Sequence, residues 1–182
     1  MAPAVPPPGL VPHGSGAASP WVCRFGRLLP AGATVLDLAC GGGRHGRLFL
    51  ERGHPVVFLD RTLAGIADLK DRESAELIEA DIENGPWPLK DGRQFDALVV
   101  TNYLWRPLKP QLIAVLKPGG VLIYETFMRG NERYGKPGNP DFLLQPHELL
   151  DWCREAGFDI RAFEQGEETN AVRQRICAVK AS

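Results

Sequence analysis

The feature that most constrains the fold is a short apolar run that ends in an acid and leads into three consecutive glycines. Residues 34–38 are β-branched or apolar except for Asp37, and glycines occupy positions 41–43. Apolar and β-branched runs of this length are typical of buried strands. Glycine adopts positive φ and has no Cβ, so such a loop approaches a ligand closely, and the amides that open the next helix point at that ligand. The pattern therefore predicts a strand that leads into a nucleotide-binding loop.

Strand-like and helix-like segments alternate along the rest of the chain. We expect strands over residues 35–38, 56–60, 75–81, 95–100 and 120–125, with two more near 158–164 and 172–180. Helices are expected over residues 44–52, 62–70, 107–116 and 146–156, after a first helix capped by Ser19 with Pro20 in its first turn. This alternation predicts an α/β, Rossmann-like fold, in which a doubly wound, mostly parallel seven-stranded sheet carries helices on both faces.

The length of 182 residues corresponds to a single domain. Residues 1–18 are rich in Pro, Ala, Gly and Ser, and we expect them to be flexible, which leaves residues 19–182 as the domain. Residues 126–145 form a long, polar, glycine-rich insertion after the fifth predicted strand. Insertions of this kind are usually lids, binding loops or mobile surface, and the interpretation favoured here is a substrate lid.

The charge balance and the cysteines limit the partners and the compartment. The net charge is −1 and the basic residues are spread among carboxylates, so we do not expect nucleic acid as a partner. The four cysteines and four histidines are scattered, which predicts neither a disulfide framework nor a metal site. No apolar run is long enough to cross a bilayer and no export signal is visible, so we expect a soluble cytoplasmic protein. The sequence leaves the oligomeric state open.

The glycines admit two nucleotide interpretations. In the first, Gly41, Gly43 and Gly46 form a G-x-G-x-x-G pattern between a strand and a helix, as in dinucleotide-binding folds, with Asp60 placed for a ribose diol. This pattern alone is common. It would make the protein an NAD(P)-dependent oxidoreductase, although no hydride-transfer constellation is recognisable.

The second interpretation starts from the acid. Residues 37–43, Asp-Leu-Ala-Cys-Gly-Gly-Gly, resemble the acid-x-G-x-G-x-G loop of class I S-adenosylmethionine-dependent methyltransferases, with Ala39 where the first glycine usually lies. Asp60 at the end of the second strand, Asp81 followed by Ile82, and the Lys-Pro-Gly-Gly turn at 117–120 occur in the order typical of that family. The loop and the small size are also similar to tellurite-resistance-type and related small-molecule methyltransferases.

The resemblance implies S-adenosyl-L-methionine as the cofactor. Asp60 would accept hydrogen bonds from the ribose hydroxyls, and Asp81 would accept one from the adenine amine. Carbonyls near Ala39 and Asn102 would accept from the ammonium group. Asp37 would hold the loop or reach the amino group through water, and His45 either contacts the cofactor or packs at the helix start. The expected cofactor residues are Asp37, Ala39, Gly41, Gly43, His45, Asp60, Arg61, Asp81, Ile82 and Asn102.

The reaction expected is methyl transfer to a small-molecule acceptor whose identity the sequence does not give. Methyl transfer is an in-line displacement, so alignment of the acceptor and exclusion of water matter most, and a general base is optional. Candidates for contact with the acceptor are His45, Tyr103, Arg106, Glu125, Asn131, Arg133 and Tyr134. A third possibility is a non-catalytic sensor that binds the cofactor without turnover, because a fold does not establish an activity.

Overall fold

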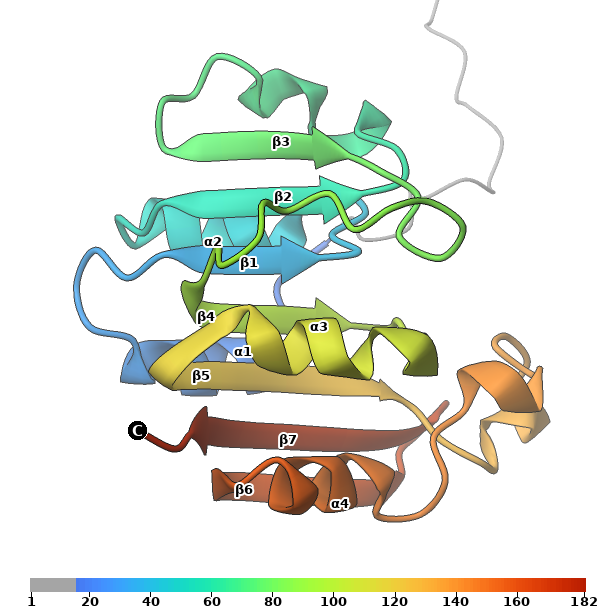
Figure 1. Ribbon diagram of the computed structural model, residues 1–182. Helices are drawn as coiled ribbons and strands as arrows, with labels where there is room; N and C mark the ends of the chain where they lie inside the picture. Colours follow the sequence, from blue (N-terminus) through green and yellow to red (C-terminus); the bar gives the residue numbers. More distant parts are fainter. Residues whose placement is uncertain (1–15) are drawn as a thin grey trace, which may run out of the picture.

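The computed structural model describes residues 16–182, which form one seven-stranded sheet between two layers of helices (Figure 1). Most of the segment 1–18 that was predicted to be flexible lies outside the described residues. The strands are β1 (Val35–Leu38), β2 (Val56–Asp60), β3 (Ala75–Glu79), β4 (Phe95–Thr101), β5 (Leu116–Phe127), β6 (Phe158–Glu167) and β7 (Val172–Lys180). The α-helices are α1 (Pro20–Phe25), α2 (Arg44–Glu51), α3 (Lys109–Ala114) and α4 (Glu148–Glu155).

The strands lie in the order β3-β2-β1-β4-β5-β7-β6. The first five strands along the chain are parallel to one another, whereas β7 is antiparallel to both β5 and β6. The predicted seven-stranded, mostly parallel sheet is confirmed, with an antiparallel hairpin at one end. All five parallel strands finish at the same edge, on the right in Figure 1, so the residues that follow them meet there. We call this edge the carboxyl edge.

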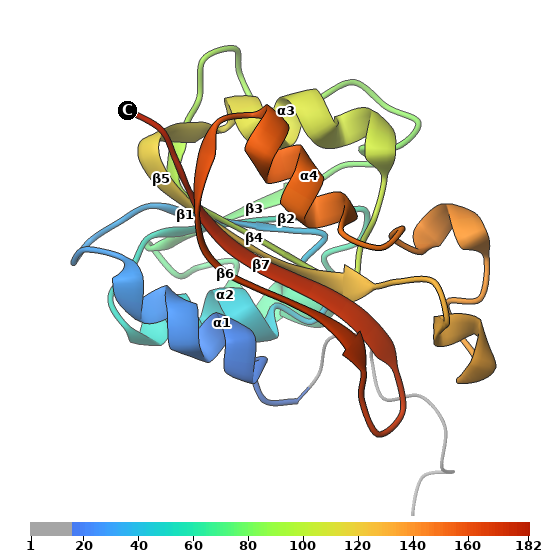
Figure 2. The same ribbon diagram turned by 90° about the horizontal axis from the view of Figure 1, so that it is seen from below.

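Helices cover both faces of the sheet. Figure 2 shows α1 and α2 on one face and α3 and α4 on the other. Successive side chains of a strand point to opposite faces. In β1, Val35 belongs to the core on the α1–α2 face, whereas Leu36 and Leu38 belong to the core on the α3–α4 face. The same alternation turns Asp37 towards α2.

The first helix begins as the sequence predicts. The Ser19 side-chain oxygen accepts a hydrogen bond from the Trp21 amide at 3.1 Å, and Pro20 occupies the first helical position. This is the usual way to satisfy an amide that has no partner within the helix. The indole nitrogen of Trp21 donates to the Ile176 carbonyl at 3.3 Å and so fastens α1 to β7.

The segments between strands differ from the prediction in detail. Residues 62–70 contain 3-10 turns over Ala64–Leu69, interrupted at Ile66, instead of a regular helix. The segment 107–116 divides into the 3-10 turn Arg106–Leu108, α3 and the start of β5. Two more 3-10 turns occupy Asn131–Arg133 and Pro140–Phe142. Near the start of the chain, the 3-10 turn Gly26–Leu28 extends α1. In the part of the chain from residue 16 onward, no helix combines the length and apolar character needed to cross a membrane.

Gly46 lets α2 pack directly on β2. A Cβ built on Gly46 would overlap the ring of Phe58, which is completely buried in β2. Because the ring has no free space into which to move, a larger residue must push the helix away from the sheet. The third glycine of the motif therefore has a packing role.

Gly46→Ala is expected to lower the free energy of unfolding by about 1 to 3 kcal/mol, the usual cost of overpacking a core. Urea denaturation at neutral pH measures this change. The control is the double variant Gly46→Ala/Phe58→Leu, in which the smaller side chain makes room for the methyl group. Additive losses in the double variant would contradict the proposed contact.

Candidate functional site

The glycine loop after β1 takes an alternating backbone path at the carboxyl edge. Ala39 has φ 54°, Gly41 φ 53° and Gly43 φ 70°, all in the left-handed region. The Gly43 amide donates to the Cys40 carbonyl at 2.8 Å and tightens the turn. A residue with a Cβ costs about 1 to 2 kcal/mol in this region. Ala39 therefore keeps the backbone conformation that a glycine would adopt at that position.

Asp37 holds the start of α2. One carboxylate oxygen accepts a hydrogen bond from the Gly46 amide at 2.8 Å, and the side chain is buried. Gly46 lies in the first turn of α2, where backbone amides have no partner within the helix. Burial raises the pKa of Asp37 to about 7, and the bond from Gly46 offsets part of that effect. Of the two predicted roles, holding the loop is the one the protein contacts show.

Asp60 links the end of β2 to the glycine loop. One carboxylate oxygen accepts from the Gly41 amide at 2.8 Å and the other from the Thr62 amide at 3.1 Å. Each carboxylate oxygen has a second lone pair and can accept a further hydrogen bond. The side chain is half-buried, so these lone pairs are accessible from the carboxyl edge.

Asp81 shapes the turn that follows β3. One oxygen accepts from the amides of Glu83 and Asn84 at 3.0 and 3.1 Å, and the other accepts from the Asn84 side chain at 3.0 Å. These bonds lower the pKa of Asp81, with the Asn84 side chain as the largest cause and the charge of Arg61 as a smaller one. The turn ends β3 at Glu79, earlier than the predicted boundary at residue 81. Ile82, next in the chain, packs half-buried against the core.

His45 is buried, and both of its ring nitrogens contact other parts of the protein. Nε2 accepts from the Ser19 amide at 3.2 Å, and Nδ1 lies 3.2 Å from the Thr101 hydroxyl. Because an amide only donates, Nδ1 carries the proton and donates to Thr101. Burial, helped by the charge of Arg44, lowers the pKa of His45 to about 3 and keeps the ring neutral. Of the two predicted roles, packing at the helix start is the one these contacts describe.

The residues after β4 complete the carboxyl edge next to the glycine loop. Asn102 has φ 54°, and its side-chain oxygen accepts from Arg173 at 2.6 Å. The Tyr103 hydroxyl is buried and has no hydrogen-bond partner among the described residues. Its pKa is raised by burial and then by the carboxylate of Glu83, through its charge and its closeness to the hydroxyl, with a smaller effect from Asp81; the hydroxyl therefore lies beside Glu83 in the turn after β3, without the geometry of a hydrogen bond. A buried donor without a partner is costly, and a ligand at this edge would satisfy it.

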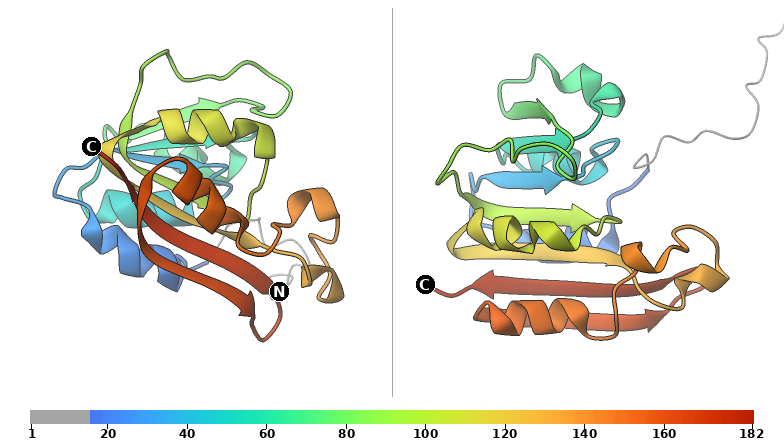
Figure 3. Two further views of the ribbon diagram at one scale, coloured as in Figure 1. Left: turned by 60° about the horizontal axis from the view of Figure 1, so that its bottom comes forward. Right: turned by 45° about the vertical axis from the view of Figure 1, so that its right-hand side comes forward.

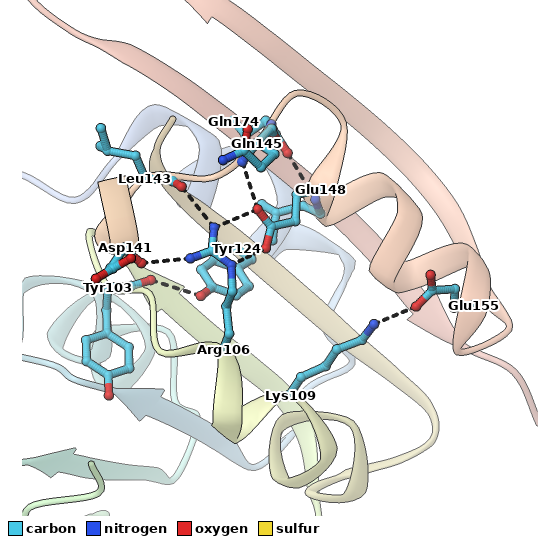
Figure 4. Close-up of polar contacts among 11 residues, drawn as sticks. Tyr103, Arg106, Lys109, Tyr124, Asp141, Leu143, Gln145, Glu148, Glu155 and Gln174 are labelled. Carbon is cyan, nitrogen blue, oxygen red and sulfur yellow. Dashed lines mark hydrogen bonds and ion pairs between the residues drawn. The ribbon is translucent and has the colours of Figure 1, made fainter. Parts of the chain in front are cut away.

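Arg106, a predicted acceptor contact, binds the protein itself. Figure 4 shows its guanidinium between the chain near residue 141 and the start of α4, with the Tyr103 ring pointing away from it. It forms a two-pronged ion pair with Glu148, at 2.7 and 2.9 Å, and donates to the carbonyls of Asp141 and Leu143. These bonds anchor residues 128–147, which connect β5 to α4 and are called here the β5–α4 segment.

The remaining candidates for acceptor contact also bind within the protein. Asn131 is buried and bridges the Pro137 carbonyl and the Val172 amide, both at 3.1 Å. The Tyr134 hydroxyl donates to Glu167, which also pairs with Arg133 at 3.4 Å. Figure 3 shows the β5–α4 segment beyond the tip of β5, at the carboxyl edge where the glycine loop also lies.

Glu125 in β5 belongs to a charged cluster that the sequence analysis did not single out. Arg175 of β7 donates to it at 3.0 Å, and Glu125 is almost fully buried. Arg175 also contacts Glu168, which in turn lies 3.6 Å from Arg173. The arginines alternate with buried residues along residues 172–176, so the only available sequence signal was a polar face on the last strand.

Between residues 16 and 182, no group of three or more His, Cys, Asp or Glu side chains is arranged to hold a metal ion. The strand order bears on the two nucleotide interpretations. Dinucleotide-binding folds have the order 3-2-1-4-5-6 in a parallel sheet. Here the antiparallel β7 lies between β5 and β6. This difference counts against an NAD(P)-dependent oxidoreductase.

Comparisons with known proteins bear on the same choice. Residues 35–120 match the family model described as a methyltransferase domain. The malonyl-[acyl-carrier protein] O-methyltransferase of Salmonella typhimurium is 37% identical over 54% of this chain and 41% of its own length. The tRNA U34 carboxymethyltransferase of Pseudoalteromonas translucida is 30% identical over 74% of this chain and 49% of its own length. The chain thus spans less than half the length of these two relatives.

Solved structures share the fold at low sequence identity. The 1,6-didemethyltoxoflavin-N1-methyltransferase of Burkholderia thailandensis, solved with S-adenosylhomocysteine, superposes with a TM-score of 0.70 at 20% identity, over 90% of this chain and 77% of its own. TehB of Haemophilus influenzae has a TM-score of 0.68 at 18% identity, over 87% of this chain and 61% of its own. Such likeness shows the fold and leaves the predicted tellurite-resistance-type subgroup untested. Together with the matched residues 35–120, it confirms the resemblance to class I S-adenosylmethionine-dependent methyltransferases.

The pKa of Asp37 predicts how stability depends on pH in the ligand-free protein. The pKa is raised from 3.8 to about 7 in the folded state. Between these values the folded protein keeps a proton that the unfolded chain has released, so the free energy of unfolding falls progressively as the pH rises from 4 to 7. Asp37→Asn keeps an oxygen for the Gly46 amide and removes the titration. The free energy of unfolding of the variant, relative to wild type, should therefore rise with pH by roughly 1 kcal/mol per pH unit.

Urea denaturation at several pH values measures this difference, in which the titration of His45 cancels because both proteins retain it. Asp81→Asn is the control, because the pKa of the exposed Asp81 is lowered. Its difference from wild type should stay flat between pH 5 and 7. Parallel stability curves for wild type and Asp37→Asn would show that the buried carboxylate does not titrate as expected.

Proposed function

Because residues 35–120 carry a methyltransferase domain, we propose that the protein binds S-adenosylmethionine at the carboxyl edge and transfers its methyl group to a small-molecule acceptor. The observation that carries the proposal is the glycine loop, with left-handed backbone at Ala39, Gly41 and Gly43, held from β1 by Asp37 and from β2 by Asp60. When bound, the sulfonium supplies an activated methyl group. The residues of this chain bind and orient the donor and exclude water.

The cofactor assignments follow the order of the strand ends. Asp60 would accept the ribose hydroxyls through the lone pairs left free by Gly41 and Thr62. Asp81 and the Ile82 amide would face the adenine, with Arg61 close by. The carbonyls of Ala39 and Asn102 would accept from the ammonium group. His45, whose ring nitrogens are both engaged, would act by holding Thr101 and the start of α2 in place.

The acceptor would enter between the loop after β4 and the β5–α4 segment. We keep the interpretation of residues 126–145 as a substrate lid, anchored through Arg106, Asn131 and the pair of Tyr134 with Glu167. Relatives act on different acceptors, including an acyl-carrier protein conjugate and a tRNA, by their names. A small acceptor is favoured here by the absence of a net positive charge.

Isothermal titration with S-adenosylmethionine, S-adenosylhomocysteine and NAD tests the proposal. The first two should bind and NAD should not. Asp60→Ala is expected to weaken S-adenosylhomocysteine binding by about 1 to 3 kcal/mol, roughly 5- to 150-fold, because charge-assisted bonds to the ribose are lost. Asp159→Ala on β6 is the control, since its exposed carboxylate pairs with Arg161 on the same strand.

Unchanged affinity in Asp60→Ala, with the fold verified by a thermal melt, would remove Asp60 from the cofactor site. Binding of NAD in place of the adenosyl compounds would replace the proposal by the oxidoreductase alternative. Release of labelled methyl groups into small molecules of a cell extract tests turnover. Tight cofactor binding without any acceptor-dependent turnover would instead favour the sensor.

Tyr103 offers a test with two readouts of opposite sign. Its buried hydroxyl has no hydrogen-bond partner among residues 16–182, so Tyr103→Phe should raise the free energy of unfolding by about 1 kcal/mol and weaken S-adenosylhomocysteine binding. The matched control is Tyr124→Phe, because the Tyr124 hydroxyl donates to the Tyr103 carbonyl at 2.9 Å. That variant should lose stability. Loss of stability in Tyr103→Phe would instead mean that its hydroxyl is bonded within the protein.

A further inference from the structure

The outer part of the β5–α4 segment has little packing of its own. Residues 132–142, called here the lid tip, include no buried side chain. The chain is fixed on both sides of the lid tip. Before it, Asn131 is buried and accepts from the Val172 amide at 3.1 Å. After it, the Leu144 amide donates to the Phe127 carbonyl at 3.0 Å. Segments with few buried contacts open at a low cost in free energy, so the lid tip is the part of the segment that can move while its ends stay in place.

One exposed contact fastens the lid tip to the β6–β7 hairpin. The Tyr134 hydroxyl donates to Glu167, the last residue of β6, and Arg133 lies 3.4 Å from the same carboxylate. We call these three residues the clasp. Among residues 16–182, the side chains of the lid tip form hydrogen bonds or ion pairs outside the β5–α4 segment only at Glu167. Tyr134 is 40% exposed and the Glu167 side chain is 53% exposed. Exposed contacts of this kind contribute little to stability, so the clasp is easily broken.

Two backbone carbonyls of the lid tip are also held, but by donors that do not belong to the hairpin. The Asn131 side chain donates to the Pro137 carbonyl at 3.1 Å. Arg106 donates to the Asp141 carbonyl at 2.7 Å. These bonds act as pivots near the two ends of the lid tip. The side of the sheet on which the lid tip lies is therefore set by the clasp.

The clasp holds the lid tip away from the expected cofactor contacts. β6 is the outermost strand in the order β4-β5-β7-β6, so three strand spacings, about 14 Å, separate it from β4. The residues expected to contact the cofactor follow β1, β2, β3 and β4. Figure 3 shows the β5–α4 segment beyond the tip of β5 and not across the ends of β1 and β2. The lid tip must therefore leave Glu167 before it can cover a ligand at these strand ends.

We propose that the clasp holds the lid open in the ligand-free protein, and that the lid tip leaves Glu167 to close over the bound donor and acceptor. This role rests on the proposed function and specifies how its substrate lid is controlled. A contact that is made only in the open state must be broken on closure, so it lowers the affinity for any ligand that the closed lid covers. Closure would exclude water from the methyl group being transferred.

Titration calorimetry with S-adenosylhomocysteine tests the sign of this effect. Tyr134→Phe and Glu167→Ala should each tighten binding by about two- to five-fold, the range expected for an exposed contact. The double variant should bind as Glu167→Ala does, because both changes break the same contact. Asp159→Ala is the matched control, since it removes a carboxylate from the other end of β6 and should leave the affinity unchanged. Thermal melts verify that each variant folds.

Hydrogen exchange measured by mass spectrometry gives a second readout. Without ligand, the amides of residues 132–142 should exchange faster in Tyr134→Phe and Glu167→Ala than in wild type. With saturating S-adenosylhomocysteine the three proteins should exchange alike, because the clasp is then open in all of them. Unchanged or weaker binding by the two variants, or a difference in exchange that persists with ligand, would overturn the proposal. Wild type that binds no adenosyl compound would instead remove the proposed function, and the role of the clasp with it.

Discussion

The hydrogen bond from the Gly46 amide to the buried carboxylate of Asp37 is the interaction on which the rest of the site depends. It joins β1 to α2 across the glycine loop, so the loop is closed at both ends. Gly46 makes this possible in two ways, because its amide donates and its missing side chain lets α2 approach Phe58. A carboxylate with one such bond in the core is expensive to ionise, which the raised pKa of Asp37 reflects.

Neutral and charged side chains hold different parts of the carboxyl edge. His45 connects Ser19 before α1, the start of α2 and Thr101 at the end of β4 without carrying a charge. Charge is concentrated further along the sheet, where Arg173 and Arg175 of β7 face β5. The cofactor side of the carboxyl edge is thus shaped by carboxylates that accept from backbone amides and by the neutral His45, and the β7 side by ion pairs.

The fold was largely predictable because it follows from local patterns. The apolar runs of β1, β2 and β4 lie within a residue of the predicted boundaries, and Ser19 caps α1 as its sequence indicates. The short turns at 64–69 were predicted as a helix because their apolar spacing is helical, yet Ile66 takes a non-helical conformation. Candidates at strand ends were identified from topology. The partners of Arg106 and Asn131 were not predictable, since Glu148 and Val172 are 42 and 41 residues away in the chain.

The reversed direction of β7 has a practical consequence for work with this molecule. Because the strand starts beside the loops of the carboxyl edge and runs away from them, Lys180 lies at the opposite end of the sheet, where Figure 1 marks the last residue. Purification tags, fluorophores or immobilisation chemistry attached after Ser182 would therefore project away from the ligand-binding side. Attachment ahead of Ser19 would instead place added groups near His45 and Arg44.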